Sequence, residues 1–183
     1  MPRDLPRPED DGAAAHLTDV RMPELSLPAT DGSAVAVDRP PPGFGVLVLY
    51  AYPRTGRPGE PELSPSWDRI PGARGCTPES CGFRDHAAEL AELGAAVAGV
   101  STQSTPDQRE AVERLGLPFP LLSDADLRLA RAVQLPTFTV AGHVMLKRLT
   151  LVVGPGVVER VFYPVFPPDR HAEEVLAWLR SNP

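Results

Sequence analysis

The sequence has 183 residues, of which 42% are apolar and 23% are charged, and its formal net charge at pH 7 is −6. This length and composition fit one globular domain with a complete hydrophobic core, with or without tails. The negative charge argues against nucleic acid or an anionic membrane as a main partner, because neither attracts an acidic protein.

The N-terminal residues are polar, rich in proline and aspartate, and without a hydrophobic period. They lack the apolar run of a secretory signal, and no later segment has enough consecutive apolar residues to cross a membrane. We therefore expect a cytoplasmic protein in which residues 1–16 form a disordered or extended tail and residues 17–183 form the domain.

The first elements of the domain are predicted to be strands. Residues 22–40 alternate apolar and polar side chains around Asp31-Gly32, a dipeptide that favours a tight turn, so we expect an N-terminal β-hairpin. Residues 44–53 form a nearly continuous apolar run, as in a strand buried on both faces of a sheet. Residues 54–75 contain repeated Gly and Pro, which predicts a long loop, and such loops usually have a function.

The rest of the chain alternates helical and strand patterns. Thr77 can cap a helix that begins at Pro78 and ends at Gly94. The later predicted elements are a strand at 95–102, a helix at 105–115, a strand at 118–124, a helix at 125–133, an antiparallel pair at 137–166 that turns around 154–156, and a helix at 169–179. This order predicts an α/β protein with a central mixed β-sheet flanked by α-helices, which matches a thioredoxin-like fold.

Both cysteines of the chain, Cys76 and Cys81, fall where the long loop meets the predicted helix. A thiol at a helix N-terminus is close to unpaired N–H groups and to the positive end of the macrodipole, so we expect a lowered pKa at Cys76 and a nucleophilic thiolate. In an intact helix, residues five positions apart are separated by about 140° around the axis and about 7.5 Å along it. A disulfide between them therefore requires the helix start to unwind.

Three interpretations of the cysteine pair follow from the residues alone. The two could be ordinary buried cysteines, although Cys76 lies between Gly75 and Thr77 and not in an apolar segment. They could be metal ligands, but the histidines are scattered without ligand spacing, at His16, His86, His143 and His171. We favour a redox pair of nucleophile and resolving thiol, because structural disulfides are rare in reducing compartments.

The segments VLYAYPRTG and GARGCTPESCGFRDHAAEL resemble the peroxiredoxins, specifically the peroxiredoxin Q-like subfamily, also called bacterioferritin comigratory proteins. The resemblance covers residues 17–180 and implies that Cys76 is the peroxidatic cysteine and Cys81 the resolving one. In this family an arginine on a later strand holds the thiolate and polarises the peroxide, and Arg148 in KRLTLVV matches it. A guanidinium suits this role because it keeps its charge and offers several fixed donors.

The sequence departs from the family pattern Pro-x-x-x-Thr-x-x-Cys, because Arg69 and Ala73 stand where its proline and threonine would be. Pro53 and Thr55 occur instead, ahead of an insertion. If the loop returns to the pocket, Pro53 shields the thiolate and the Thr55 hydroxyl touches the peroxide. The alternative is that backbone N–H groups near Gly75 do this work.

The insertion at residues 54–75 suggests a lid over Cys76. In this hypothesis Trp67 is an apolar wall of the substrate pocket and Arg74 supplies a second positive charge, which together select a bulkier or anionic hydroperoxide. The alternative is a surface loop without a role in substrate binding.

The resemblance implies a peroxidase that reduces hydrogen peroxide or organic hydroperoxides through a sulfenic acid at Cys76 and a Cys76–Cys81 disulfide. It also implies a thioredoxin or similar dithiol as reductant, no metal or organic cofactor, and a monomer or weak homodimer. Two other hypotheses keep the fold and the thiols. One is a tailoring enzyme acting on a non-standard sulfur- or peroxide-bearing substrate, and the other is a redox sensor with negligible turnover.

Overall fold

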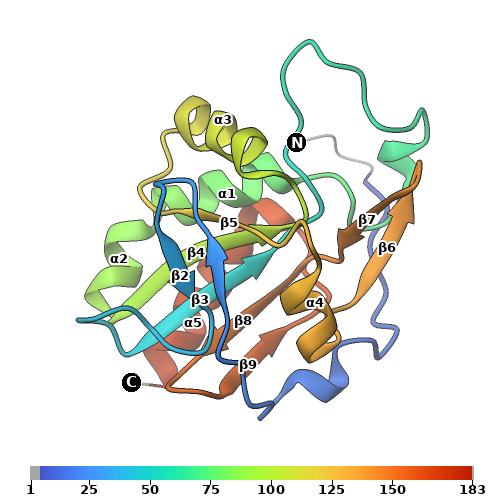
Figure 1. The fold of residues 1–183 in the computed structure, drawn as a ribbon. Helices are drawn as coiled ribbons and strands as arrows, with labels where there is room; N and C mark the ends of the chain where they lie inside the picture. Colours follow the sequence, from blue (N-terminus) through green and yellow to red (C-terminus); the bar gives the residue numbers. More distant parts are fainter. Residues whose placement is uncertain (1–4, 183) are drawn as a thin grey trace.

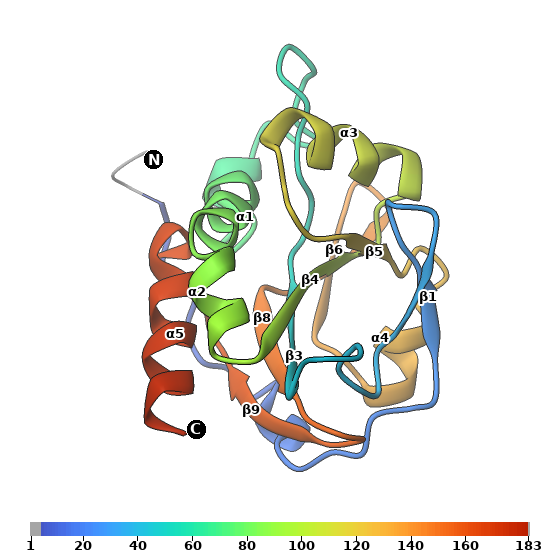
Figure 2. The same ribbon diagram turned by 90° about the vertical axis from the view of Figure 1, so that its left-hand side faces the viewer.

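A computed structural model describes residues 5–182 and shows a five-stranded sheet covered on both faces (Figures 1 and 2). The strand order is β5-β4-β3-β8-β9. Strands β3 (Val46–Ala51), β4 (Ala95–Ser101) and β5 (Leu121–Ser123) are parallel, whereas β8 (Leu149–Val153) and β9 (Val158–Phe162) extend the sheet in antiparallel pairing. The predicted α/β fold with a central mixed sheet is confirmed.

Strand β3 lies at the centre of the sheet and is buried on both faces. Leu47, Leu49 and Ala51 pack into one hydrophobic cluster, and Val48 and Tyr50 pack into the other. Alternate residues of a strand point to opposite faces, so a continuous apolar run is what a strand covered on both sides requires.

Helices α1, α2 and α5 cover one face of the sheet, and α4 covers the other together with the predicted N-terminal hairpin, which is confirmed (Figure 2). Helix α3 lies beside the edge strand β5. The bounds are β1 Ser26–Pro28, β2 Ala34–Ala36, α1 Cys76–Asp85, α2 Ala87–Glu92, α3 Thr105–Leu115, α4 Arg128–Val133 and α5 His171–Ser181.

The helix predicted over residues 78–94 differs from the one observed at its start and in its middle. It begins at Cys76, because Gly75 adopts the left-handed conformation with φ of 112° at the N-cap, and Thr77 does not cap it. It is also interrupted at His86, where φ is −107° and ψ is 9°, so that α1 and α2 are separate helices.

The antiparallel pair predicted at 137–166 contains an additional turn. Strands β6 (Thr137–Val140) and β7 (His143–Leu146) form a hairpin of their own, and the chain reverses at Ala141 and Gly142, both with positive φ. Strands β8 and β9 then pair around residues 154–156 as predicted.

The N-terminal segment lies against the domain. Within the predicted tail, residues 1–4 lie outside the described residues, and residues 5–14 lead without regular structure into a 3-10 turn at Ala15–Leu17. Ala14 and Leu17 are buried in the core. The tail is therefore attached to the fold at its C-terminal end by apolar packing.

Residues 54–75 form the predicted long loop, with one 3-10 turn at Trp67–Arg69. Trp67 is buried in a small hydrophobic cluster with Ala73 and with Met145 of β7. The insertion is therefore fixed to the β6–β7 hairpin by its own hydrophobic contacts.

Across residues 5–182, no helix combines the length and the apolar character needed to cross a membrane.

Gly99 on β4 lies directly beneath the ring of Tyr50. A Cβ at this position would meet Leu121 Cδ2 and Tyr50 Cζ, each at 2.6 Å. We predict that Gly99→Ala lowers the free energy of unfolding by about 2 kcal/mol, because both neighbours are buried and cannot move aside. Urea denaturation measures the loss.

Gly45→Ala is the matched control, since the nearest atom to its new Cβ is Gly94 O at 3.8 Å, an ordinary contact. Equal stability of the Gly99→Ala and Gly45→Ala proteins would contradict the prediction.

Candidate active site

The loop that ends at Gly75 places Cys76 in the first turn of α1. Gly75 has a positive φ that side chains rarely tolerate, so the residue before Cys76 is best served by glycine. Cys76 is 2% exposed, and its S–H donates to the carbonyl oxygen of Ala73 at 3.6 Å. The thiol is thus held between the end of the insertion and the start of the helix.

Arg148, directly before β8, joins the loop, the thiol and the helix. Its Nη2 is 3.2 Å from Cys76 Sγ and also donates to the carbonyl oxygens of Gly72 and Arg74, each at 3.2 Å. Its Nη1 donates to the carboxylate of Glu79, one helical turn after Cys76. Both Nη atoms are engaged by protein groups, whereas the buried Nε has no hydrogen-bond partner, and the side chain is 2% exposed.

Burial raises the pKa of the Cys76 thiol; Arg148 opposes this rise by its charge, and the carboxylate of Glu79 adds to it. The predicted lowering of this pKa at a helix N-terminus is therefore wrong for the folded state, because the cost of removing a thiolate from water outweighs the charge and the hydrogen bond of Arg148. Burial also raises the pKa of Glu79, again against the charge of Arg148. The one buried cation, Arg148, thus stabilises the anionic forms of two buried acids, Cys76 and Glu79. Each acid therefore weakens the stabilisation that Arg148 gives to the other.

Cys81 lies on the same helix, is partly exposed, and is a free thiol like Cys76. Because α1 is continuous from Cys76 to Asp85, the two sulfurs point to different sides of the helix and cannot bond in this conformation. Both cysteines nevertheless line one cavity of about 700 Å³. The two cysteines thus border one space, although Cys76 itself is 2% exposed.

The insertion supplies the opposite wall of this cavity, which includes Trp67 and Arg74. The ring of Trp67 is 4% exposed, so only a small part of it faces the cavity. The guanidinium of Arg74 pairs with Glu62 and Asp68, which compensates its charge. The insertion therefore contributes shape and an apolar surface more than it contributes net positive charge.

Pro53 and Thr55 lie outside the cavity that the two cysteines line. The backbone N–H and the hydroxyl of Thr55 both donate to Gln103 Oε1, at 2.8 and 3.2 Å, and Gln103 Nε2 donates back to the Thr55 carbonyl oxygen at 3.1 Å. Pro53 lines a neighbouring cavity. Arg54, between them, does line the cysteine cavity, and its backbone N–H acts to lower the pKa of Cys76.

The groups that hold α1 in place are not among the residues predicted from the sequence. Glu79 could have been found from its spacing, since a residue three positions after Cys76 lies above it on a helix. Tyr50 donates to Ser80 Oγ at 3.1 Å, and its ring stacks on Phe83 with centroids 4.6 Å apart. This pairing joins a strand to a helix in three dimensions and leaves no local pattern in the sequence.

The histidines lie apart from the cysteines. His171 is buried and bonds Thr150 Oγ1 at 2.8 Å, and His86 bonds Glu89 at 2.7 Å. Within the part of the chain that the structure describes, no group of three or more His, Cys, Asp or Glu residues is placed to hold a metal ion.

The sharing of one cation by two acids predicts opposite effects of two substitutions, both made with Cys81→Ser so that one thiol remains. Glu79→Gln lowers the pKa of Cys76, because it removes a negative charge and keeps an oxygen for Arg148. Arg148→Met raises that pKa. The pH dependence of alkylation by iodoacetamide measures both, since only the thiolate reacts quickly. Superimposable pH profiles for the three proteins would contradict this account.

Comparison with known proteins identifies the family of the chain. The redoxin family model matches residues 17–176. A putative peroxiredoxin of Mycobacterium tuberculosis is 33% identical over 138 residues, covering 75% of this chain and 79% of that protein. The chloroplastic peroxiredoxin Q of Sedum lineare is 28% identical over 135 residues, covering 74% of this chain and 63% of that protein.

Two solved structures share the fold. The peroxidoxin BcpB of Mycobacterium tuberculosis is 29% identical with a TM-score of 0.69, covering 91% of this chain and 97% of that one. Peroxiredoxin Q of Xanthomonas campestris is 27% identical with a TM-score of 0.67, covering 98% and 96%. The thioredoxin-like fold and the resemblance seen in the sequence are both confirmed, and the chain belongs to the redoxin family, among the peroxiredoxins of the peroxiredoxin Q and bacterioferritin comigratory type.

Proposed function

We propose that this protein is a thiol-dependent peroxidase that reduces hydroperoxides at Cys76. The observation that carries the proposal is the contact of 3.2 Å between Arg148 Nη2 and the sulfur of Cys76, a residue that lines a cavity large enough for an organic hydroperoxide. A buried cation beside a buried thiol stabilises the thiolate, which is the nucleophilic form.

In the first step the Cys76 thiolate attacks the terminal oxygen of the hydroperoxide. An S–O bond forms, the O–O bond breaks, and the departing alkoxide or hydroxide takes up a proton and leaves as alcohol or water. Negative charge moves from sulfur to the leaving oxygen during this step. Arg148 is held by Glu79 and by loop carbonyls, so its donors are in place before the charge moves.

In the second step the thiol of Cys81 attacks the sulfenic sulfur of Cys76, and water is released as the disulfide forms. Helix α1 must unwind for the sulfurs to meet. This unwinding breaks the Tyr50–Ser80 hydrogen bond and the stacking of Phe83 on Tyr50. A dithiol, which we propose is a thioredoxin in the cytoplasm, then restores both thiols by exchange.

We also propose that the protein acts as a monomer or a weak homodimer. Among residues 5–182, Leu93 and Val144 are the large hydrophobic side chains that are exposed, at 39% and 37%. Stable dimers usually bury a contiguous apolar patch, which these two separated side chains do not provide.

Stopped-flow mixing of the reduced protein with hydrogen peroxide tests the function. We expect Cys76→Ser to abolish the reaction, and Cys81→Ser to complete one oxidation and then stop as a sulfenic acid that a dimedone probe labels. Mass spectrometry of the peroxide-treated wild-type protein should show one intramolecular disulfide. Two free thiols after treatment would refute the proposal.

The cavity wall formed by the insertion supports organic hydroperoxides as substrates. Trp67 offers an apolar surface, whereas the pairing of Arg74 with Glu62 and Asp68 does not favour an anionic substrate. We therefore propose a neutral, bulky hydroperoxide as the preferred class.

Trp67→Ala is predicted to slow the reaction with cumene hydroperoxide about tenfold, because it removes the side chain that supports the apolar cavity wall which a bulky substrate would contact, and to change the rate with hydrogen peroxide less than twofold. Rates on both substrates are compared in the same preparation. Trp67→Phe serves as a control that keeps an aromatic anchor for the insertion. Equal losses on both substrates would show that Trp67 acts only through the stability of the loop. Poor turnover of every simple hydroperoxide would favour a tailoring enzyme with a different acceptor.

A further inference from the structure

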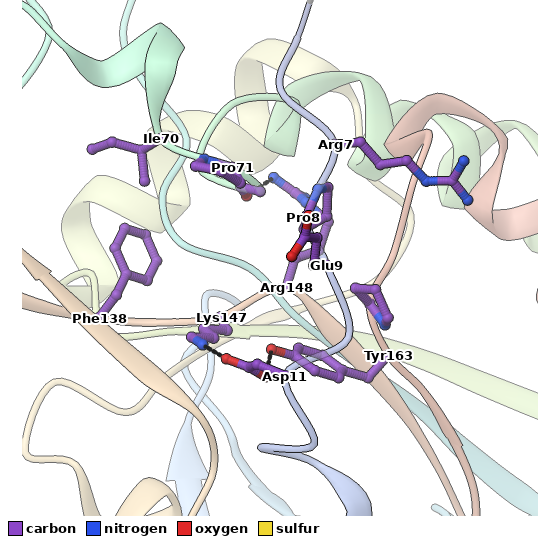
Figure 3. A pocket seen from close by; sticks show the side chains of 12 residues that line it. Arg7, Pro8, Glu9, Asp11, Ile70, Pro71, Phe138, Lys147, Arg148 and Tyr163 are labelled. Carbon is purple, nitrogen blue, oxygen red and sulfur yellow. Dashed lines mark hydrogen bonds and ion pairs between the residues drawn. The ribbon is translucent and has the colours of Figure 1, made fainter.

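The N-terminal segment, residues 5–11, passes close to Arg148 (Figure 3), and its residues line two spaces that Arg148 also lines and that the two cysteines do not. We call this segment the strap. Arg7 lies over the ring of Phe166 at 5.9 Å from its centroid. The strap is therefore positioned by defined contacts, beginning within a few residues of its start.

The strap reaches the loop whose carbonyls hold Arg148. Pro8 Cβ lies 3.8 Å from the position that a Cβ of Gly72 would occupy, and the carbonyl oxygen of Gly72 accepts a hydrogen bond from Arg148. Between the strap and this loop lies a cavity of about 420 Å³ with Arg148 in its lining. A second space lined by Leu5, Pro6 and Arg148 measures only about 10 Å³. The strap thus covers the guanidinium on this side, where the Arg148 side chain is 2% exposed even though it borders this cavity.

Asp11 fixes the strap to the strands. Its Oδ2 accepts from Lys147 Nζ at 2.5 Å, and its Oδ1 accepts from the hydroxyl of Tyr163 at 2.6 Å (Figure 3). These bonds hold the pKa of Asp11 far below its usual range, so the carboxylate stays ionised at any physiological pH. Lys147 precedes Arg148 directly in the chain, so the anchor of the strap is one residue from the catalytic cation.

We propose that Asp11 and the strap are positioning elements for Arg148, which keep its guanidinium dry and aimed at Cys76. This inference rests on the proposed function for its meaning in catalysis. An ion pair between Arg148 and the Cys76 thiolate is weakened by water and by salt when one partner is open to solvent, and much less when it is enclosed. Because the strap encloses Arg148 and lines neither wall of the Cys76 cavity, its removal weakens the stabilisation of the thiolate without relieving the burial of the sulfur.

The charged groups around Arg148 allow a clean experiment. Glu79 and Cys76 face it from α1, Lys147 adjoins it in the chain, and Arg7 and Glu9 line the strap-side cavity. Substitutions in the strap leave the first two unchanged. Asp11→Ala and Asp10→Ala each remove one negative charge, so a difference between them in the pKa of Cys76 reports the loss of the anchor and not the loss of charge alone.

The test uses the full chain with Cys81→Ser, and compares Asp11→Ala with a protein lacking residues 1–11. Asp10→Ala is the matched control, because the Asp10 carboxylate bonds only the N–H of Gly12, within its own turn. Tyr163→Phe removes one of the two side-chain bonds to the Asp11 carboxylate and keeps Lys147 in place. For each protein, the alkylation rate of Cys76 by iodoacetamide is measured against pH at low and at high salt.

We expect the Asp11→Ala protein and the truncated protein to show a raised pKa of Cys76 that becomes sensitive to salt. The rate of their reaction with hydrogen peroxide at pH 7 should fall about fivefold to tenfold, because a higher pKa of Cys76 leaves a smaller fraction of the protein as thiolate. Tyr163→Phe should show a smaller change in the same direction, and Asp10→Ala none.

Identical pH profiles and salt responses in all these proteins, with unchanged thermal unfolding, would overturn the proposal. The proposal would also be overturned if the pKa of Cys76 changed only in variants with a lower unfolding temperature and changed equally at low and at high salt. The alkylation profile does not depend on peroxide turnover. If the wild-type protein failed to reduce hydroperoxides, the proposed function would fall while the effect of the strap on Cys76 could still be decided.

Discussion

The structure depends on one buried guanidinium that holds three parts of the chain together. Arg148 contacts the thiol of Cys76, the carboxylate of Glu79 and the carbonyl oxygens at the end of the insertion. A buried charge that loses its partners destabilises the folded state, so the loss of one of these contacts is expected to weaken the others. The position of the thiol, the start of α1 and the path of the insertion are consequences of satisfying this one cation.

This arrangement has two opposing effects on the thiol. Burial raises the pKa of Cys76, and the same burial strengthens the attraction of Arg148 for the thiolate. The competition from Glu79 keeps the cation from stabilising the thiolate fully, while the bond to Glu79 keeps the cation in place. The bond to Glu79 thus fixes the orientation of the Arg148 donors, but it lowers the fraction of Cys76 that is thiolate. A solvent-exposed arginine would not impose this balance.

Much of the fold could be predicted from the sequence because its signals are local. The apolar run of residues 44–53 indicated a strand buried on both faces, and Asp31-Gly32 indicated the N-terminal hairpin, both of which are confirmed. The helix start was placed two residues late because a glycine N-cap in a left-handed conformation looks like part of the preceding loop. The turn at Ala141 and Gly142 was missed because the apolar side chains continue on both sides of it.

The site was predictable only in part. Gly-Cys-Thr and the second cysteine are adjacent in sequence and point to redox chemistry on their own, whereas Arg148 could be found only through the family resemblance. The bond of Asp11 to Lys147 joins residues 136 positions apart, and no local pattern announces such a pair. The predicted pKa of Cys76 was wrong because a dipole argument counts the helix and leaves out the depth at which the sulfur is buried.

The break at His86 has a consequence for the redox cycle. Helices usually melt as cooperative segments, so an uninterrupted helix through residue 92 would carry any disruption at its start toward the sheet. Here the interruption limits the rearrangement to Cys76–Asp85, and α2 can remain docked through Leu90. In the oxidised protein, a short unwound peptide would then carry the disulfide while the rest of the fold stays native. The docked helix α2, which begins after His86, would remain as the structure against which α1 reforms once the disulfide is reduced.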